Sequence, residues 1–352
     1  MVFVLGGNKA NREGINLFGK DIWVSDDDGK KNLYIDGASL PQKITSWQQL
    51  EPVAKIKDLI TLTIVNIDVP SLQGAEFLLQ NSALRAFSIA NSHLRAIEGI
   101  EAFPHLTYVD VSGNEITDIS PLTKTRLGEL YCGNNPFKNI EDLGSLPLTM
   151  LGLKGSKLTS TDWLKNLSNM TSLSVEECGL QSLEFVQSLK QLEVLRAQDN
   201  AIVDMSPLSS MAKLNKLFLN KNQIAKIAGL ETCAALKILY LENNQINAIE
   251  GLDGCTALEN LYLEGNQIPR IQGLARLQSL EVLSLKNNKI QKIEGLGGLH
   301  KLRYLNLAGN PLAKDDAKLL GKIEKKYEKE YGLPKDTHIV TDLREYCEKK
   351  KL

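Results

Sequence analysis

The residues that could carry out acid–base or metal chemistry are dispersed along this sequence. The four histidines share no common spacing, and none stands with cysteine or carboxylate residues at metal-ligand intervals: His93, His105, His300 and His338. No serine-nucleophile elbow, phosphate-binding loop or glycine-rich dinucleotide motif is present. The acidic run at 26–28 lacks the alternating ligands and final glutamate of a calcium loop. The sequence therefore predicts no catalytic residue, no metal site and no cofactor, so we do not expect an enzyme.

A repeat with a period of 22 residues dominates residues 62–312. Its clearest copies are consecutive, from KLNKLFLNKNQIAKIAGLETCA at 213–234 to SLEVLSLKNNKIQKIEGLGGLH at 279–300. Each copy fits L-x-x-L-x-L-x-x-N-x-I-x-x-I-x-x-L, which is the pattern of a leucine-rich repeat, and a fixed period in this range indicates a stacked solenoid. We therefore predict an α/β solenoid: a leucine-rich-repeat horseshoe with a parallel concave β-sheet and short helical or 3-10 turns on the convex side.

Steps of about 22 residues divide 62–312 into twelve repeats. They begin at Leu62, Leu84, Leu106, Leu127, Leu148, Met170, Leu192, Leu214, Leu236, Leu258, Leu280 and Leu302. The first repeat is degenerate, with Pro70 at the asparagine position, and the fifth has Ser156 there. Such irregular repeats are expected to interrupt the smooth stacking of the coils.

Each part of the repeat has an expected structural role. L-x-x-L-x-L forms a short strand whose second and third leucines point into the coil, while the residues between them point outward. The asparagines should form a ladder whose amides satisfy backbone groups in the turns: Asn114, Asn135, Asn200, Asn222, Asn244, Asn266, Asn288 and Asn310. The I-x-x-I-x-x-L segment has helical spacing, and SPL at 120–122 and 206–208 places proline at the start of that turn.

The outward strand positions contain one distinctive column. Phe218, Tyr240 and Tyr262 occupy the same position in three consecutive repeats, with Glu242 and Glu264 beside them. Aromatic and arginine anchors dominate protein interfaces, so we predict a partner-binding patch here. The patch also includes three outward residues of neighbouring coils: Glu176, Arg196 and Tyr304. The alternative is that the aromatic side chains only stabilise the sheet by cross-strand contact.

A second, smaller group of the same kind lies nearer the N-terminus. Tyr108, Asp110, Glu129 and Tyr131 are also at outward strand positions. It is a second candidate for partner binding, subject to the same alternative of sheet stabilisation.

The two ends of the chain differ from the repeat. Residues 1–61 are expected to form an N-terminal cap, with a hairpin of strands at 22–24 and 33–35 and a short helix at 44–60 that Pro52 limits. Residues 313–352 have helical spacing around Ala317, Leu320 and Ile323, which predicts a helical C-terminal cap with a second helix at 341–350. A docking helix is the alternative role for this end.

Four of the five cysteines fit structural positions of the repeat. Cys132, Cys233 and Cys255 take apolar positions and Cys178 takes an asparagine position, whereas Cys347 lies in the tail. We expect reduced, buried thiols, which behave as small hydrophobes. The alternative is a disulfide between Cys233 and Cys255, which are one period apart, but no secretory signal indicates an oxidising compartment.

Composition restricts the partner and the location. The net charge of −1 gives no basic surface for nucleic acid, and no apolar run is long enough to span a membrane. The N-terminus lacks the features of a signal peptide. We expect a monomer in the cytoplasm or nucleus, or a secreted protein if a signal peptide has been removed.

The repeats resemble two families of the 22-residue class. NQIAKIAGLETC, NQINAIEGLDGC and NKIQKIEGLGGL are similar to repeats of the leucine-rich-repeat regulatory subunit of protein phosphatase 1. ITDISPLT at 116–123 and IVDMSPLS at 202–209 resemble the repeats of bacterial internalins, more distantly. The first resemblance implies a scaffold that binds a Ser/Thr phosphatase catalytic subunit through aromatic and acidic residues of its concave face. The second implies an adhesin or secreted effector that binds a host protein.

The sequence therefore predicts a non-catalytic scaffold that binds a protein partner on its concave face. In the first version of this function the protein is a phosphatase regulatory subunit. The alternative is an internalin-like adhesin or secreted effector that binds a host protein. An enzyme whose activity resides in residues 1–61 is a further alternative. No residue constellation in that segment supports it, and the segment is small for an independent fold.

Overall fold

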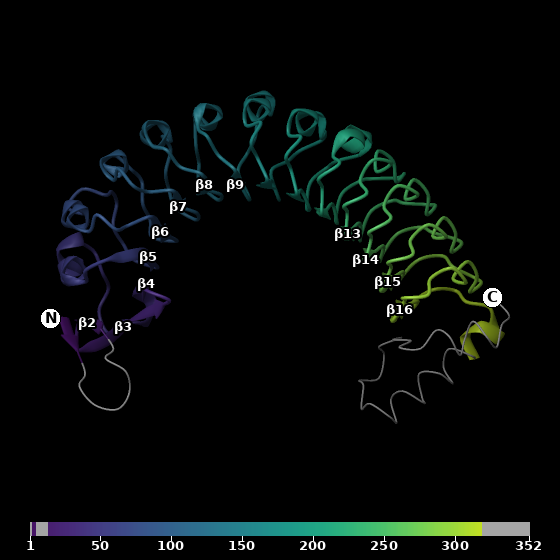
Figure 1. Ribbon diagram of the computed structural model, residues 1–352, viewed down its shortest axis with the longest axis horizontal. Coiled ribbons are helices and arrows are strands. Elements are labelled where there is room, and N and C mark those ends of the chain that lie inside the picture. The colour runs from purple at the N-terminus through teal and green to yellow at the C-terminus, as the bar shows by residue number, and fades with distance from the viewer. Residues whose placement is uncertain (1, 5–12, 319–352) are drawn as a thin grey trace. The chain divides into compact units, whose positions relative to one another are not determined.

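The computed structural model describes residues 2–4 and 13–318, with side chains from residue 13 onward. The chain forms two compact units, Met1–Leu167 (unit 1) and Ser168–Leu352 (unit 2), and each is described by itself. In both units, successive coils place short strands on one side, and the remainder of each coil returns along the opposite side (Figure 1). We call the side of each sheet onto which the outward strand positions project the strand face.

Unit 1 begins with antiparallel strands: β1 (Val2–Val4), β2 (Glu13–Leu17), β3 (Lys20–Asp27) and β4 (Lys30–Asp36). The β3–β4 pair is the predicted hairpin, with Val24 opposite Leu33, and both strands are longer than expected. Asp28 and Gly29 form its turn at φ values of 53° and 80°. Two successive positive φ values are typical of the tight hairpin turn that Asp-Gly favours. The hairpin prediction is confirmed.

The parallel sheet of unit 1 starts at β4, before the first sequence repeat. β4 pairs in parallel with β5 (Leu59–Val65), so the chain between them makes a full coil. That coil contains η1 (Gly37–Ser39) and the 3-10 helix η2 (Trp47–Lys55). The buried residues of η2 are Trp47, Leu50 and Val53, three residues apart, which matches the three residues per turn of a 3-10 helix. The expected short helix at 44–60 is thus present in 3-10 form.

The rest of unit 1 alternates strands and 3-10 helices. Its elements are η3 (Glu76–Gln80), β6 (Ala86–Ala90), η4 (Ile100–Ala102), β7 (Tyr108–Asp110), η5 (Ser120–Lys124), β8 (Glu129–Tyr131), η6 (Ile140–Ser145), β9 (Met150–Gly152) and η7 (Asp162–Asn166). From β5 to β9, each strand pairs in parallel with the next one along the chain.

Unit 2 continues the same architecture with fewer helices. Its elements are β10 (Ser172–Ser174), η8 (Glu184–Ser188), β11 (Val194–Arg196), η9 (Ser206–Ser210), β12 (Lys216–Phe218), β13 (Ile238–Tyr240), β14 (Asn260–Tyr262), β15 (Val282–Ser284) and β16 (Tyr304–Asn306). All these strands are parallel, in sequence order and in register. The predicted leucine-rich-repeat solenoid with a parallel sheet is confirmed.

In the most regular coils the predicted convex turns are present as isolated i→i+3 turns and not as helices; the Cys233 N–H, for example, donates to the Leu230 carbonyl oxygen at 3.0 Å. The I-x-x-I-x-x-L segments from residue 223 to 302 contain no helix, whereas the SPL segments form the 3-10 helices η5 and η9. The reason is a glycine near the end of each such segment. Gly251, for example, has φ of 68°, and a Cβ there would lie 2.5 Å from the Ile227 carbonyl oxygen of the preceding coil. A residue with positive φ that packs on backbone cannot continue a right-handed turn.

The predicted asparagine ladder joins neighbouring coils. The Asn244 amide nitrogen donates to the carbonyl oxygens of Leu219 and Leu241, both at 3.0 Å, and its side-chain oxygen accepts from the Ile224 N–H at 3.0 Å. The same three bonds recur at Asn222, Asn266 and Asn288. Each asparagine therefore satisfies buried backbone groups of two coils, as expected from the repeat.

Leucines, isoleucines and cysteines fill the interior of the coils. The inward strand leucines such as Leu217, Leu239 and Leu261 are fully buried. Cys233 and Cys255 are also buried and are not joined by a disulfide. Residues 314–318 are helical, and Asp316 Oδ2 accepts a hydrogen bond of 3.0 Å from the Ile293 N–H. The predicted continuation of this helix, the helix at 341–350 and Cys347 lie outside the described residues.

Candidate functional site

The strand face of unit 2 carries the predicted aromatic column as a continuous stack of rings. Register pairs Phe218 with Tyr240 and Tyr240 with Tyr262 on β12, β13 and β14. The ring centroids of Phe218 and Tyr240 are 5.0 Å apart with an interplanar angle of 14°, and those of Tyr240 and Tyr262 are 4.3 Å apart at 11°. All three residues are partly exposed. We call these residues the aromatic column.

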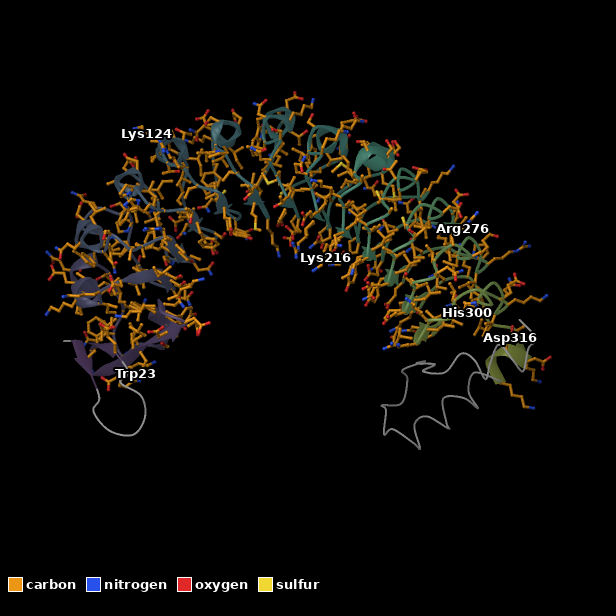
Figure 2. The ribbon with its side chains drawn as sticks, viewed as in Figure 1. Trp23, Lys124, Lys216, Arg276, His300 and Asp316 are labelled. Carbon is orange, nitrogen blue, oxygen red and sulfur yellow. The ribbon has the colours of Figure 1, made fainter. Side chains whose placement is uncertain are left out.

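A cation lies at the N-terminal end of the aromatic column. The register places Arg196 of β11 next to Phe218, and the guanidinium carbon is 5.0 Å from the Phe218 ring centroid. A guanidinium at this distance is attracted to the ring electrons, with a typical strength of about 0.5–1 kcal/mol at exposed sites. Lys216 of β12 lies on the same side of unit 2 (Figure 2). The face therefore presents positive charge at one end of the stack.

Acidic residues lie beside the other part of the aromatic column. Glu242 and Glu264 follow β13 and β14 at the same repeat position. Burial raises the pKa of Glu242 to about 7, and the neighbouring charge of Glu264 adds to the effect. One carboxyl oxygen of Glu242, Oε2, is buried and has no hydrogen-bond partner among the described residues. Glu264 instead accepts a 2.6 Å hydrogen bond from the Ser284 hydroxyl.

The tyrosine hydroxyls share this environment. Burial raises the pKa of Tyr262 to about 12, with contributions from Tyr240 and from the charge of Glu242. The Tyr262 hydroxyl therefore stays neutral at physiological pH. The site as a whole offers aromatic surface, hydroxyl donors and one carboxyl group that changes charge near neutrality.

Two of the predicted contact residues are placed differently from the rest. Glu176 is only 7% exposed and accepts hydrogen bonds from the Ser174 hydroxyl and, at 3.2 Å, from Gln198 Nε2. Tyr304 lies on β16, two strands beyond Tyr262, and its hydroxyl accepts from Asn306 Nδ2 at 3.3 Å. Neither residue joins the ring stack, so the site is centred on the aromatic column, Arg196 and the two glutamates Glu242 and Glu264.

The second predicted cluster is also assembled, on the strand face of unit 1. The ring centroids of Tyr108 and Tyr131 are 5.7 Å apart with an interplanar angle of 41°. Burial raises the pKa of Tyr108 to about 12, and the charges of Asp110, Tyr131 and Glu129 act in the same direction. The four residues thus interact with one another, as their repeat positions implied.

The structure also contains a cavity that sequence reasoning missed. In unit 1, residues after β4, β5 and β6 surround a space of about 270 Å³, lined among others by Lys43, Asp68 and His93. His93 has φ of 54°, and its imidazole Nδ1 lies 3.0 Å from Glu115 Oε1. The only sequence signal for this cavity is that its residues follow successive strands, which is true of every coil.

Metal-binding clusters and membrane-spanning helices are absent from residues 13–318. That part of the chain holds no group of three or more histidine, cysteine, aspartate or glutamate residues that could bind a metal ion. Its helices are all too short or too polar to cross a membrane.

Comparison with known proteins supports the repeat and the fold. The family model described as "Leucine Rich repeats (2 copies)" matches residues 104–145, 235–276 and 278–319. No curated protein sequence matches the chain. Among solved structures, an internalin (inlF) from Listeria monocytogenes is 26% identical, with a TM-score of 0.69 over 82% of this chain and 83% of that one. The chain therefore has the leucine-rich-repeat fold, which is similar to that of an internalin.

Other similar structures agree on the fold alone. A leucine-rich-repeat protein from Leptospira interrogans is 18% identical, with a TM-score of 0.56 over 82% of this chain and 93% of that chain. The functional domain of InlJ from Listeria monocytogenes, which includes a cysteine ladder, is 20% identical, with a TM-score of 0.53 over 79% of this chain and 53% of that chain.

Proposed function

We propose that this protein is a non-catalytic scaffold that binds a protein partner on the strand face of unit 2. The observation that supports this most strongly is the aromatic column, in which three rings stack in register at 4.3–5.0 Å and remain partly exposed. Aromatic side chains lose little conformational entropy on binding and are enriched among residues that dominate interface energies. Stacking also holds the rings in place before a partner arrives.

The charges around the aromatic column define the expected partner surface. Glu242 and Glu264 would face basic groups of the partner, and Arg196 would face acidic ones. Such complementary charges favour the correct partner and orientation more than they add affinity. The partner surface should therefore combine an apolar centre with a basic margin.

The similarity to an internalin favours one specific version of this function. This chain is 26% identical to that internalin, and its ITDISPLT and IVDMSPLS segments contain the start of η5 and η9. Both observations support an internalin-like adhesin or effector that binds a host protein. The phosphatase version, in which the partner is a Ser/Thr phosphatase catalytic subunit, stays a prediction from repeat sequence. We propose a cell-surface or secreted location for the first version and an intracellular one for the second.

One experiment tests the scaffold proposal and separates its versions. The full chain is immobilised, a partner is captured and identified from cells of the source and from host cells, and its affinity is then measured with purified components. The variant F218A/Y240A/Y262A should lose at least about 100-fold in affinity, since each interface anchor typically contributes 1 kcal/mol or more. The control R276A/K292A changes exposed residues of unit 2 away from the strands.

The outcomes are distinct. Equal affinity of the triple variant and the wild type would rule out the aromatic column as the binding site. A phosphatase catalytic subunit would support the regulatory version, and a host receptor would support the internalin-like one.

A further inference from the structure

The strand face of unit 1 has an unusual distribution of charge. The outward positions of β4 to β8 and the residues directly after them are 30, 32, 34, 36, 61, 63, 65, 86, 88, 90, 108, 110, 112, 129, 131 and 133. They include three acidic residues, Asp36, Asp110 and Glu129, and one basic residue, Lys30, which begins β4 opposite Asp27. The next basic residue at such a position is Lys154, after β9. This face is therefore negative although the whole chain is nearly neutral.

Shape accompanies the charge. Tyr34 on β4 is 58% exposed, and Tyr108 stands on β7 of the same sheet. The side chains between them on β5 and β6 are small: Thr63, Ala86 and Ser88. Three strand spacings separate β4 from β7, which is about 14 Å. We call this stretch of small side chains between Tyr34 and Tyr108 the trough, and its width matches one peptide segment in an extended or helical form.

The aromatic wall of this trough is held in position by a glycine. Tyr131 pairs in register with Gly152 of β9. A Cβ at Gly152 would lie 2.5 Å from Tyr131 Cδ1, so the tyrosine ring occupies the space above the glycine. The same ring contacts Tyr108 at 5.7 Å. The absence of a side chain at Gly152 therefore lets Tyr131 lie against the sheet next to Tyr108.

We propose that the trough on the strand face of unit 1 is a second docking surface, independent of the aromatic column, for an arginine- or lysine-containing peptide segment of a protein partner. Asp110 and Glu129 supply the opposite charge, and the rings of Tyr108 and Tyr131 supply faces on which a guanidinium stacks. Two surfaces on separate units would let the scaffold hold two segments of one partner, or two partners, at the same time. This goes beyond the proposed function, which needs only unit 2.

A synthetic peptide tests this surface without a known partner. The probe is a fluorescently labelled (Arg-Ala)₄ peptide, compared with (Glu-Ala)₄, and binding to the full chain is followed by fluorescence anisotropy. All measurements use a background in which unit 2 is disabled by F218A/Y240A/Y262A with E242Q/E264Q. Binding that remains in this background cannot come from the aromatic column, so the result is separate from the test of the proposed function.

Two changes in unit 1 should weaken binding of the basic peptide. D110N/E129Q removes both charges but keeps side-chain size, and should weaken binding about tenfold. G152A leaves every charge in place but displaces Tyr131, and should weaken binding several-fold. The control E98Q/E141Q removes two exposed charges of unit 1 that lie off the strands and should leave affinity unchanged. Circular dichroism establishes that each variant is folded.

The inference is overturned if the basic peptide binds the disabled-unit-2 background no better than the acidic peptide does. It is also overturned if E98Q/E141Q weakens binding as much as D110N/E129Q, because the attraction would then be general rather than located in the trough. Loss of affinity in D110N/E129Q and G152A, but not in the control, supports it.

Discussion

The carboxyl group of Glu242 makes the stability of this protein depend on pH in a direction opposite to that of most carboxylates. Burial raises its pKa from 4.5 to about 7 in the folded protein. Between these values the folded state binds a proton that the unfolded state has released. The contribution of Glu242 to the free energy of unfolding is therefore fully present below pH 4.5, and it falls as pH rises towards 7.

The variant E242Q isolates this effect. Glutamine has the size of a protonated glutamic acid and never ionises, so the variant should match the wild type at pH 4 and be more stable at pH 8. Each unit of pKa shift corresponds to about 1.4 kcal/mol, so the difference in unfolding free energy at pH 8 should be at most about 3.5 kcal/mol, and less because solvent reaches part of the carboxyl group. Because Glu242 binds a proton near neutral pH, a basic group of a partner would compete with that proton for the carboxylate.

The assay is thermal and urea unfolding of both proteins at pH 4, 6 and 8. The control is E250Q, which makes the same substitution at an exposed glutamate that lies 3.7 Å from Lys226. The reasoning is refuted if E242Q is equally or less stable than the wild type at pH 8, or if its advantage is as large at pH 4.

Three further predictions concern the coils of unit 2. Asn244→Ala removes three hydrogen bonds of 3.0 Å and should lower the free energy of unfolding by about 2–4 kcal/mol, as measured by urea unfolding. The control Gln245→Ala changes the exposed neighbouring residue and should alter that free energy by less than about 0.5 kcal/mol. Gly251→Ala places a Cβ 2.5 Å from a carbonyl oxygen at φ of 68°, so its melting temperature should fall by several degrees, and an unchanged value would contradict the close packing. Burial raises the thiol pKa of Cys233 to about 11 and that of Cys255 to about 12. Neither thiol should therefore react with a thiol reagent at pH 8 until denaturant is added. Peptide mapping of the labelled protein identifies which cysteines have reacted.

Sequence periodicity predicted the strands and the alignment of their side chains well. A fixed period places equivalent residues at the same height in successive coils, so the pairing of Phe218 with Tyr240 and of Tyr240 with Tyr262 followed from counting alone. The asparagine ladder followed for the same reason. Both features depend on backbone register, which the repeat determines.

Features that depend on side-chain rotamers or on local backbone conformation were not predictable in this way. The position of Arg196 over Phe218 and the space that Tyr131 takes above Gly152 are set by how side chains lean along the sheet. The missing helices of the regular coils arise from glycine contacts with the preceding coil, as at Gly251, which a helical spacing of isoleucines does not reveal. The strand β2 was missed because EGINL is short and lies outside the repeat.

Side-chain footprinting of the captured complex tests the central claim most directly. Hydroxyl-radical labelling, read out by mass spectrometry, compares the oxidation of Phe218, Tyr240 and Tyr262 in the free protein and in the presence of saturating partner. We expect these three rings to be protected strongly, with Leu79 and Val203, which are exposed and lie off the strands, serving as internal references. Protection confined to other surfaces, with the three rings oxidised as fast as in the free protein, would contradict the account.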